Sequence, residues 1–246
     1  MKSYLPAAFN ILSRKLQLTA LLLATSALTN QACAEYELSP YKASYNAKIS
    51  GINAELQQTL TPANKQQWRM HSEVSALFIT IDEEALFSLK NDTVTPHTYQ
   101  YTNPLNSKRN SNLVFNPSGK NVNNTLISRP PFAIPASAQD KLSFQTQLRL
   151  DLSNDPTFKQ KDYALVEAKR VKTYTLKVLA EETITTPAGT FKAVKLEQRR
   201  DNNEEYSLIW LAVEHEYFVL RIERIEEGET EFLIDLKAAE IAGEKI

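Results

Sequence analysis

The sequence is poor in the residues that most often carry local chemistry. Its 246 residues include one cysteine, three histidines and five scattered glycines. A disulfide scaffold needs several cysteines and a phosphate-binding loop needs clustered glycines, so both are excluded. The chain balances 28 Lys and Arg against 29 Asp and Glu, which argues against a nucleic-acid-binding face. What remains is ordinary for one globular domain, with 42% apolar and 23% charged residues.

Residues 1–34 have the pattern of a secretory signal peptide. Three basic residues and no acidic one accompany an apolar run of 13 residues at 16–28. This run is shorter than the roughly 20 residues that a membrane-spanning helix needs. The small-x-small triplet Ala32-Cys33-Ala34 follows and predicts cleavage after Ala34. We therefore expect a periplasmic protein whose mature chain is a single β-rich domain at 35–246.

Cys33 raises the alternative of a lipoprotein, in which it would be acylated. Asn30 stands where a lipobox has an aliphatic residue, so the cleaved and soluble form is favoured. The mature chain then has no cysteine, which excludes disulfides and thiol catalysis. No second long apolar run follows, so we expect no transmembrane segment in the mature chain.

Apolar and polar residues alternate through most of the chain, which predicts antiparallel strands. The expected strands lie near 38–49, 54–61, 66–75, 84–90, 97–102, 108–115, 121–127, 171–184, 190–200, 205–213, 217–225 and 230–239. Thr186–Gly189 and Asn116–Gly119 have Pro second and Gly fourth, which predicts a type I turn with a left-handed residue in a G1 bulge. Residues 201–203 supply another turn.

The proline-rich segment 128–135 separates the two sets of strands. The next segment, 137–152, gives conflicting signals. Five large apolar residues fall on one parity, as in a strand, whereas Ser137 is followed by Asp140 as at a helix N-terminus. The residues alone favour a short helix only weakly.

Several short motifs occur in an order that resembles the exported bacterial family called domain of unknown function 3108. They are Gln139–Phe144, Gln147–Arg149, Tyr174–Val178, Glu182–Phe191, Ile209–Ala212 and Val219–Ile222. The resemblance covers about 41–236. The strand after Trp-Leu-Ala commonly carries a proline in the family, and Tyr217–Arg221 lacks it. The resemblance implies a secreted, largely antiparallel protein with a helix before the C-terminal strands, but no established activity and no catalytic residues.

Together these patterns predict a mainly β fold. We expect a single large antiparallel sheet curled into an open barrel or spiral, with one short helix at about 137–152 packed near its opening. Such a sheet makes an apolar cleft wherever side chains do not fill it. Trp68 and Trp210 are expected to fill the core rather than to form binding platforms, since the Trp210 segment is apolar on both parities.

Two charged clusters invite a chemical interpretation. Glu214-His215-Glu216 reads either as a general base oriented by a carboxylate or as a solvated turn between strands, and the turn is favoured. Asp82-Glu83-Glu84, after the apolar Leu77-Phe78-Ile79, reads either as a divalent-cation site or as a loop, and the loop is favoured. His71, His97 and His215 are far apart, so we expect no metal site, and nothing indicates a cofactor.

Gln139, Asp140 and Arg149 form the polar constellation that the resemblance emphasises. A buried Asp–Arg pair would either orient the helix against the sheet or bind a polar head group, and the first role is favoured. The leading hypothesis is a non-enzymatic binder of a lipid-like envelope ligand or of another envelope protein. The alternatives are a periplasmic hydrolase using scattered carboxylates such as Asp140 and Glu182, and a structural module that presents edge strands.

Overall fold

The computed structural model describes residues 38–200 and 205–246. The expected signal peptide, the Cys33 alternative and the turn at 201–203 lie outside these residues. The strands are β1 (Tyr41–Ile49), β2 (Ile52–Pro62), β3 (Gln67–Ala76), β4 (Ile79–Lys90), β5 (Thr93–Thr102), β6 (Ser111–Phe115), β7 (Asn121–Asn124), β8 (Phe132–Ala133), β9 (Gln160–Val166), β10 (Val171–Thr186), β11 (Gly189–Arg199), β12 (Tyr206–Ala212), β13 (Phe218–Glu226), β14 (Glu229–Ile241) and β15 (Glu244–Lys245). The helices are α1 (Ser143–Asn154) and the short 3-10 turns η1 (Ser107–Arg109) and η2 (Val213–His215).

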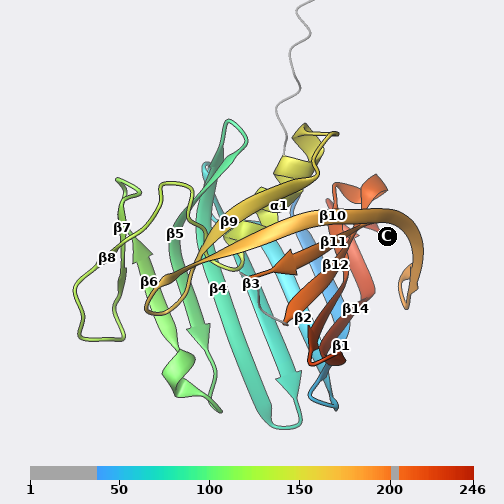
Figure 1. Cartoon of the computed structure of the whole chain (residues 1–246), viewed down its shortest axis with the longest axis horizontal. Coiled ribbons are helices and arrows are strands. Elements are labelled where there is room, and N and C mark those ends of the chain that lie inside the picture. The colour runs from blue at the N-terminus through green and yellow to red at the C-terminus, as the bar shows by residue number, and fades with distance from the viewer. Residues whose placement is uncertain (1–37, 201–204) are drawn as a thin grey trace, which may run out of the picture. The chain divides into compact units, whose positions relative to one another are not determined.

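The chain builds one antiparallel sheet outward from its centre. Its order is β8-β7-β6-β5-β4-β3-β2-β1-β14-β13-β12-β11-β10-β9, and β15 pairs with β14. From β1 the strands run outward to β8, the chain crosses through α1 to the opposite edge at β9, and the later strands return to the centre. There β14 pairs with β1, so that Tyr41 lies opposite Ile241. The sheet is curled but not closed, which confirms the expected mainly β, open-barrel architecture (Figure 1).

Each expected strand is present, but some bounds differ. β4 begins at Ile79 instead of 84, and β5 begins at Thr93 instead of 97. The two-residue strands β8 and β15 were not expected, and neither was β9. β9 escaped notice because its first three residues are polar and exposed, as is common on an edge strand.

The acidic segment 82–84 lies inside β4, so both its interpretations as a loop and as a cation site are wrong. Alternation along the strand sends its side chains to opposite faces. Asp82 pairs with His71 at 2.5 Å on one face. Glu83 accepts a hydrogen bond from the Tyr99 hydroxyl at 2.9 Å on the other.

The two predicted proline turns differ. Gly119 has φ +67, and its N–H donates to the Asn116 carbonyl at 2.8 Å, as a type I turn with a left-handed glycine requires. Gly189 has φ +153, which only glycine adopts readily but which is not the predicted left-handed conformation. Because Thr186 pairs directly with Gly189, the loop has two residues and the predicted G1 bulge is wrong there.

The predicted helix is confirmed, but it begins at Ser143 instead of near Ser137. It is enclosed on most sides, with seven of its residues buried: Ser143, Phe144, Thr146, Leu148, Arg149, Leu150 and Leu152. A helix covered nearly all round has no single apolar stripe, and for this reason its sequence lacked a helical period. Within the part of the chain that the structure describes, no helix has the length and apolar character to cross a bilayer.

The β10–β11 hairpin folds over the strands at the centre of the sheet, where Figure 1 draws β10 as a long curved ribbon. The Ala188 N–H donates to the Leu236 carbonyl at 3.1 Å, and the Arg221 guanidinium donates to the Thr185 carbonyl at 3.0 Å. The hairpin thereby adds a second layer outside β13 and β14 and covers a face that would otherwise meet solvent.

Trp210 of β12 is buried, as predicted, with 5% of its surface exposed. Trp210 belongs to the apolar core, as expected. Charged groups, which were not expected, also reach it. Its indole N–H donates to Glu182 at 2.6 Å, and the Lys195 ammonium lies 4.8 Å from its ring centroid.

Candidate functional site

Gln139 joins the two ends of the curled sheet just before α1. Its backbone N–H donates to the Ala164 carbonyl at 2.9 Å, and its carbonyl accepts from the Val166 N–H at 2.8 Å. These bonds add residue 139 to the edge of β9 as a parallel bridge. Its side-chain Nε2 donates across to the Val94 carbonyl of β5 at 2.8 Å. The residue thus links one wall of the opening to the other.

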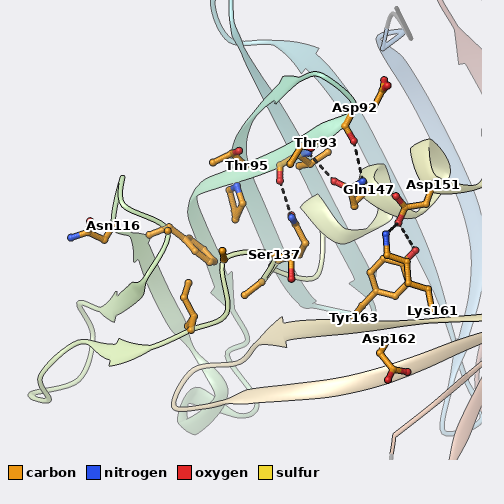
Figure 2. A pocket seen from close by; sticks show the side chains of 18 residues that line it. Asp92, Thr93, Thr95, Asn116, Ser137, Gln147, Asp151, Lys161, Asp162 and Tyr163 are labelled. Carbon is orange, nitrogen blue, oxygen red and sulfur yellow. Dashed lines mark hydrogen bonds and ion pairs between the residues drawn. The ribbon is translucent and has the colours of Figure 1, made fainter. Parts of the chain in front are cut away.

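A cleft of about 290 Å³ opens beside this link, and we call it the α1 cleft. Its lining comes from five segments: Asp92–Pro96 of β5, Phe115, Asn116 and Gly119 at the β6–β7 turn, Ile134 and Ala136–Gln139 before the helix, Gln147 and Asp151 of α1, and Lys161–Tyr163 of β9. Figure 2 shows these segments surrounding the cleft. The volume lies at the lower end of the range for small-molecule pockets.

One end of the α1 cleft is polar and tightly bonded. Asp151 accepts hydrogen bonds from Tyr163 at 2.6 Å, from Lys161 at 2.8 Å and from Gln147 at 3.0 Å (Figure 2). Burial, together with the hydrogen bond to Asp151 and its charge, raises the pKa of Tyr163 above its usual range. The phenol therefore stays protonated and acts as a donor. Asp162 points away from this group and bonds Thr175 of β10.

The other end is mainly apolar, and it holds one polar atom without a partner. Phe115, Ile134 and Ala138 line this end together with Val94. Gln139 is 3% exposed and lines the same cleft, yet its Oε1 has no hydrogen-bond partner among the described residues. An unpaired buried acceptor costs about 1–3 kcal/mol, so Gln139 is the lining residue whose hydrogen bonding is incomplete.

Asp140 serves the start of the helix. Its Oδ1 accepts from the backbone N–H groups of Leu142 and Ser143, both at 2.9 Å, and the Ser143 Oγ in turn accepts from the Asp140 N–H at 3.1 Å. This reciprocal bonding resembles a capping box. Because the group is fully buried, desolvation raises the pKa of the Asp140 carboxyl to about 6, against the opposing hydrogen bonds from Ser143 and Leu142.

Arg149 lies in the middle of α1 and does not pair with Asp140, so the expected Asp–Arg pair is wrong. Its Nε donates to the Glu216 carbonyl at 2.9 Å, and its guanidinium lies 3.3 Å from the Glu216 carboxylate. The guanidinium also lies 5.6 Å from the Phe218 ring centroid and 5.8 Å from that of Tyr41.

The Glu214–Glu216 cluster forms the turn between β12 and β13, as favoured from the sequence. The contact between Glu216 and Arg149 was not expected from the sequence. Among residues 38–200 and 205–246, no three His, Cys, Asp or Glu side chains converge as a metal site would require. The two carboxylates of the hydrolase hypothesis are also apart, since Asp140 caps α1 whereas Glu182 bonds Trp210 and Lys195.

Four residues of the polar end were not among the candidate site residues from the sequence: Gln147, Asp151, Lys161 and Tyr163. Of these, Gln147 was named only as part of a family motif. Gln147 and Asp151 are four residues apart on a helix, and Lys161 and Tyr163 are two apart on a strand, so each pair shares a face. That spacing was the available signal, but using it required knowing that β9 exists.

The fold was compared with solved structures. MucB aligns over 82% of this chain and 52% of its own, at 10% identity and a TM-score of 0.36, so this chain spans about half of its length. A protein described as exported, with a YmcC-like fold, from Bacteroides fragilis aligns over 81% and 95%, at 11% identity and a TM-score of 0.40. A protein described as a lipoprotein from Parabacteroides distasonis aligns over 83% and 100%, at 11% identity and a TM-score of 0.34. We transfer no function from these likenesses.

None of the curated proteins with which the sequence was compared matches it. A family does match, and it is the one that the motif order resembles. The match runs over residues 36–232, which takes in the sheet from β1 to β13, helix α1 and the beginning of β14. On the extent of that match, this chain belongs to the family of proteins of unknown function designated DUF3108.

Proposed function

We propose that this protein is exported to the periplasm and binds a small amphiphilic molecule of the cell envelope in the α1 cleft, without catalysing a reaction. The observation that carries the proposal is the unpaired, buried Oε1 of Gln139. A ligand hydroxyl or amide would donate to this oxygen. Such a bond recovers much of the energy lost by leaving the acceptor unpaired, so it favours ligands that bring a donor.

The lining supports an amphiphile over a purely apolar ligand. Phe115 and Ile134 offer apolar contact, while Lys161 and Tyr163 lie at the polar end. Tyr163 and Lys161 already bond Asp151, so the polar end is rigid before any ligand enters. The modest volume suits a small molecule, or one short chain of a larger one.

The three residues singled out in the sequence take different roles in this proposal. Gln139 binds the ligand and holds the two walls together. Asp140 and Arg149 position the helix, since they bond its first turn and the β12–β13 turn. Export is supported by the pattern of residues 1–34, in which basic residues and a short apolar run precede a small-x-small cleavage site.

The protein is purified from its host after the membranes have been removed. Native mass spectrometry of this preparation tests for a bound ligand. Calorimetry with 1-octanoyl glycerol then tests the chemistry, with methyl octanoate as the comparison because it has no donor. We expect the glycerol ester to bind about 5-fold to 100-fold more tightly, as one bond to a buried acceptor allows. A clean ligand-free mass together with equal or absent binding of both esters would overturn the proposal.

Two tryptophan substitutions provide a matched pair. Ala136 lines the cleft and is exposed, so Ala136→Trp should fill the mouth without disturbing the core. Ala133 is equally exposed and is not among the lining residues, so Ala133→Trp serves as the control. Only the first variant should lose binding of 1-octanoyl glycerol, while both should keep the melting temperature of the parent.

A further inference from the structure

The turn between β3 and β4 exposes two large apolar side chains at the end of a long hairpin. Leu77 is 83% exposed and Phe78 is 102% exposed. The sequence suggested that these residues belong to an apolar strand, but Ala76 pairs with Ile79, so they form a two-residue turn. The remaining two-residue turns of the described strands contain Ser-Gly, Asn-Asp, Pro-Ala, Glu-Gly and Ala-Gly.

The backbone of this turn is also strained. Leu77 has φ +55, and Phe78 does not share a positive φ. In hairpins of this kind glycine is the usual first residue, since a side chain there meets the backbone. Neither side chain belongs to the apolar core or packs against it. An exposed apolar pair that also strains the chain is explained by a contact outside the molecule.

A second apolar tip lies on the same edge of the sheet. β4 and β5 pair antiparallel, and Asp82 lies opposite Thr102, so the loop after β5 emerges beside the start of β4. Leu105 in this loop is 70% exposed. Figure 1 shows the β3–β4 turn and the loop after β5 at the lower edge of the sheet. We call Leu77, Phe78 and Leu105 the apolar rim.

On the β5 side of the apolar rim, the charged residues are basic. Lys108 and Arg109 of η1 are exposed, and neither has an ion-pair partner among the described residues. No acidic residue occurs in 75–80 or 103–110. Along the hairpin the nearest acidic residues are Glu73 and Asp82, which lie opposite each other. Three residue pairs separate them from the turn.

The opposite border of the same edge is acidic. The Ser50 N–H of the β1–β2 turn donates to the Glu231 carbonyl, which places the β13–β14 hairpin beside it. That hairpin turns at Glu227-Gly228 and carries four acidic residues, Glu226, Glu227, Glu229 and Glu231. An anionic surface would repel this border and attract the η1 side, so the charges specify one orientation.

We propose that the apolar rim inserts into the interface of an anionic phospholipid membrane, with Lys108 and Arg109 at the headgroups. The apolar side chains stand on separate turns and form no pocket, whereas a protein partner is recognised through packed and enclosed anchors. A fluid lipid interface accepts such isolated side chains, and basic residues add attraction to anionic headgroups. The proposal does not depend on what the α1 cleft binds.

Flotation of the mature chain with vesicles tests the proposal. Vesicles of equal parts phosphatidylglycerol and phosphatidylcholine should bind the protein, and vesicles of phosphatidylcholine alone should bind it more weakly. Phe78→Ser should weaken partitioning about 10-fold, the effect of keeping one large apolar side chain in water. Leu179→Ser removes an exposed apolar residue of β10 and should change nothing. Lys108→Gln with Arg109→Gln should abolish the preference for phosphatidylglycerol.

Leu77→Gly separates docking from folding. Glycine relieves the strained turn, so this variant should melt at a higher temperature than the parent while it floats less. Ala136→Trp, which fills the α1 cleft, should float like the parent. The proposal is overturned if the parent does not bind either vesicle, or if Phe78→Ser floats unchanged. It is equally overturned if the parent dimerises through Phe78 without binding lipid, since a second copy then covers the rim.

Discussion

Asp140 combines two properties that conflict at neutral pH. Its carboxyl is fully buried, which favours the neutral form and gives a pKa of about 6, yet it accepts the backbone hydrogen bonds that begin α1. Below about pH 4 the group is protonated in the folded and the unfolded chain alike. Between about pH 4 and 6 the unfolded chain ionises first, so the unfolded state gains stability as the pH rises.

We therefore expect the Asp140 contribution to the free energy of unfolding to fall as the pH rises, by about 2–3 kcal/mol between pH 4 and 7. Asp140→Asn keeps an acceptor for the helix N-terminus and does not titrate, so it should flatten this part of the profile. Urea unfolding of both proteins at intervals of half a pH unit measures the difference. If the two profiles run parallel, the carboxyl does not titrate in this range.

Trp210 tests the packing between neighbouring strands of the sheet, since Lys195 lies directly opposite it on β11 and Glu182 lies on the next strand, β10. Trp210→Ala should lower the free energy of unfolding by about 3–5 kcal/mol, since it empties an aromatic site in a packed region. Trp210→Phe should cost less, because it loses the hydrogen bond to Glu182 but keeps most of the contact. With Trp68→Phe as the background, Trp210 emission should resist quenching by neutral acrylamide. Efficient quenching would place the indole in solvent.

The sequence predicted the burial of Trp210 but not its surroundings. Apolar neighbours on both parities of its own strand indicate that both faces are covered, and they are. The charged neighbours come from the adjacent strands: Lys195 lies on β11 and Glu182 on β10. Which residues meet across strands depends on the register of the pairing, and residue alternation within one strand does not encode that.

Polar bonds fix helix α1 at its start and at its middle, and Arg149 makes the long-range one. Its side chain is buried against Tyr41 and Phe218, and it reaches the Glu216 carbonyl and carboxylate. Glu216 has φ +52, an unusual conformation for a residue that is not glycine. The turn that presents these oxygens therefore depends on the arginine as much as the helix does.

Arg149→Lys should lower the free energy of unfolding by about 1–3 kcal/mol, because a lysine cannot reproduce the planar fork that bonds the Glu216 carbonyl and lies near the Tyr41 and Phe218 rings. Glu216→Gln is the matched comparison. It keeps the backbone carbonyl and changes only a carboxylate that is 39% exposed, so its effect should stay below about 1 kcal/mol. Equal losses in the two variants would assign the contribution to the ion pair instead of the carbonyl bond.

At the scale of elements, the sequence predicted the long alternating strands. It was ambiguous or silent for α1 and β9, because unusual burial or exposure hides their periodicity. α1 is covered nearly all round, so five apolar residues of one parity looked like a strand. β9 is half polar because it lies at an edge, so it looked like a loop. Both elements contribute to the α1 cleft, and for that reason Gln139 was the one residue of its lining that the sequence offered as a candidate site residue.

Over the whole molecule, the open sheet is held in its curl by contacts between its two ends. Gln139 bonds both β5 and β9, and the Asn124 side chain of β7 donates to the Ala168 carbonyl of the β9–β10 turn at 2.9 Å. The sequence predicted the curl in outline, since many strands with little glycine must bury one face. It did not predict the two contacts, because each joins segments more than 25 residues apart.

The pairing of β1 with β14 brings the first described strand and the last long one side by side. The Ala242 N–H donates to the Pro40 carbonyl at 2.8 Å, and β15 folds back along β14. A linker of about six residues should therefore join Ile246 to Leu38 without strain. Pro130 and Pro131 are exposed and have no backbone N–H to lose, so the chain can be opened between them.

A circular permutant that begins at Pro131 and ends at Pro130 should fold, with a melting temperature within about 5 °C of the parent. The cut divides no strand, so the permutant can form every strand pairing of the sheet. Opening the same joined chain between Ser44 and Tyr45 is the control. That cut divides the central strand, which pairs with β2 on one side and β14 on the other, and it should prevent cooperative folding. Circular dichroism melts of the two permutants decide the matter. If both unfold alike, the centre of the sheet is not the element that joins the two halves.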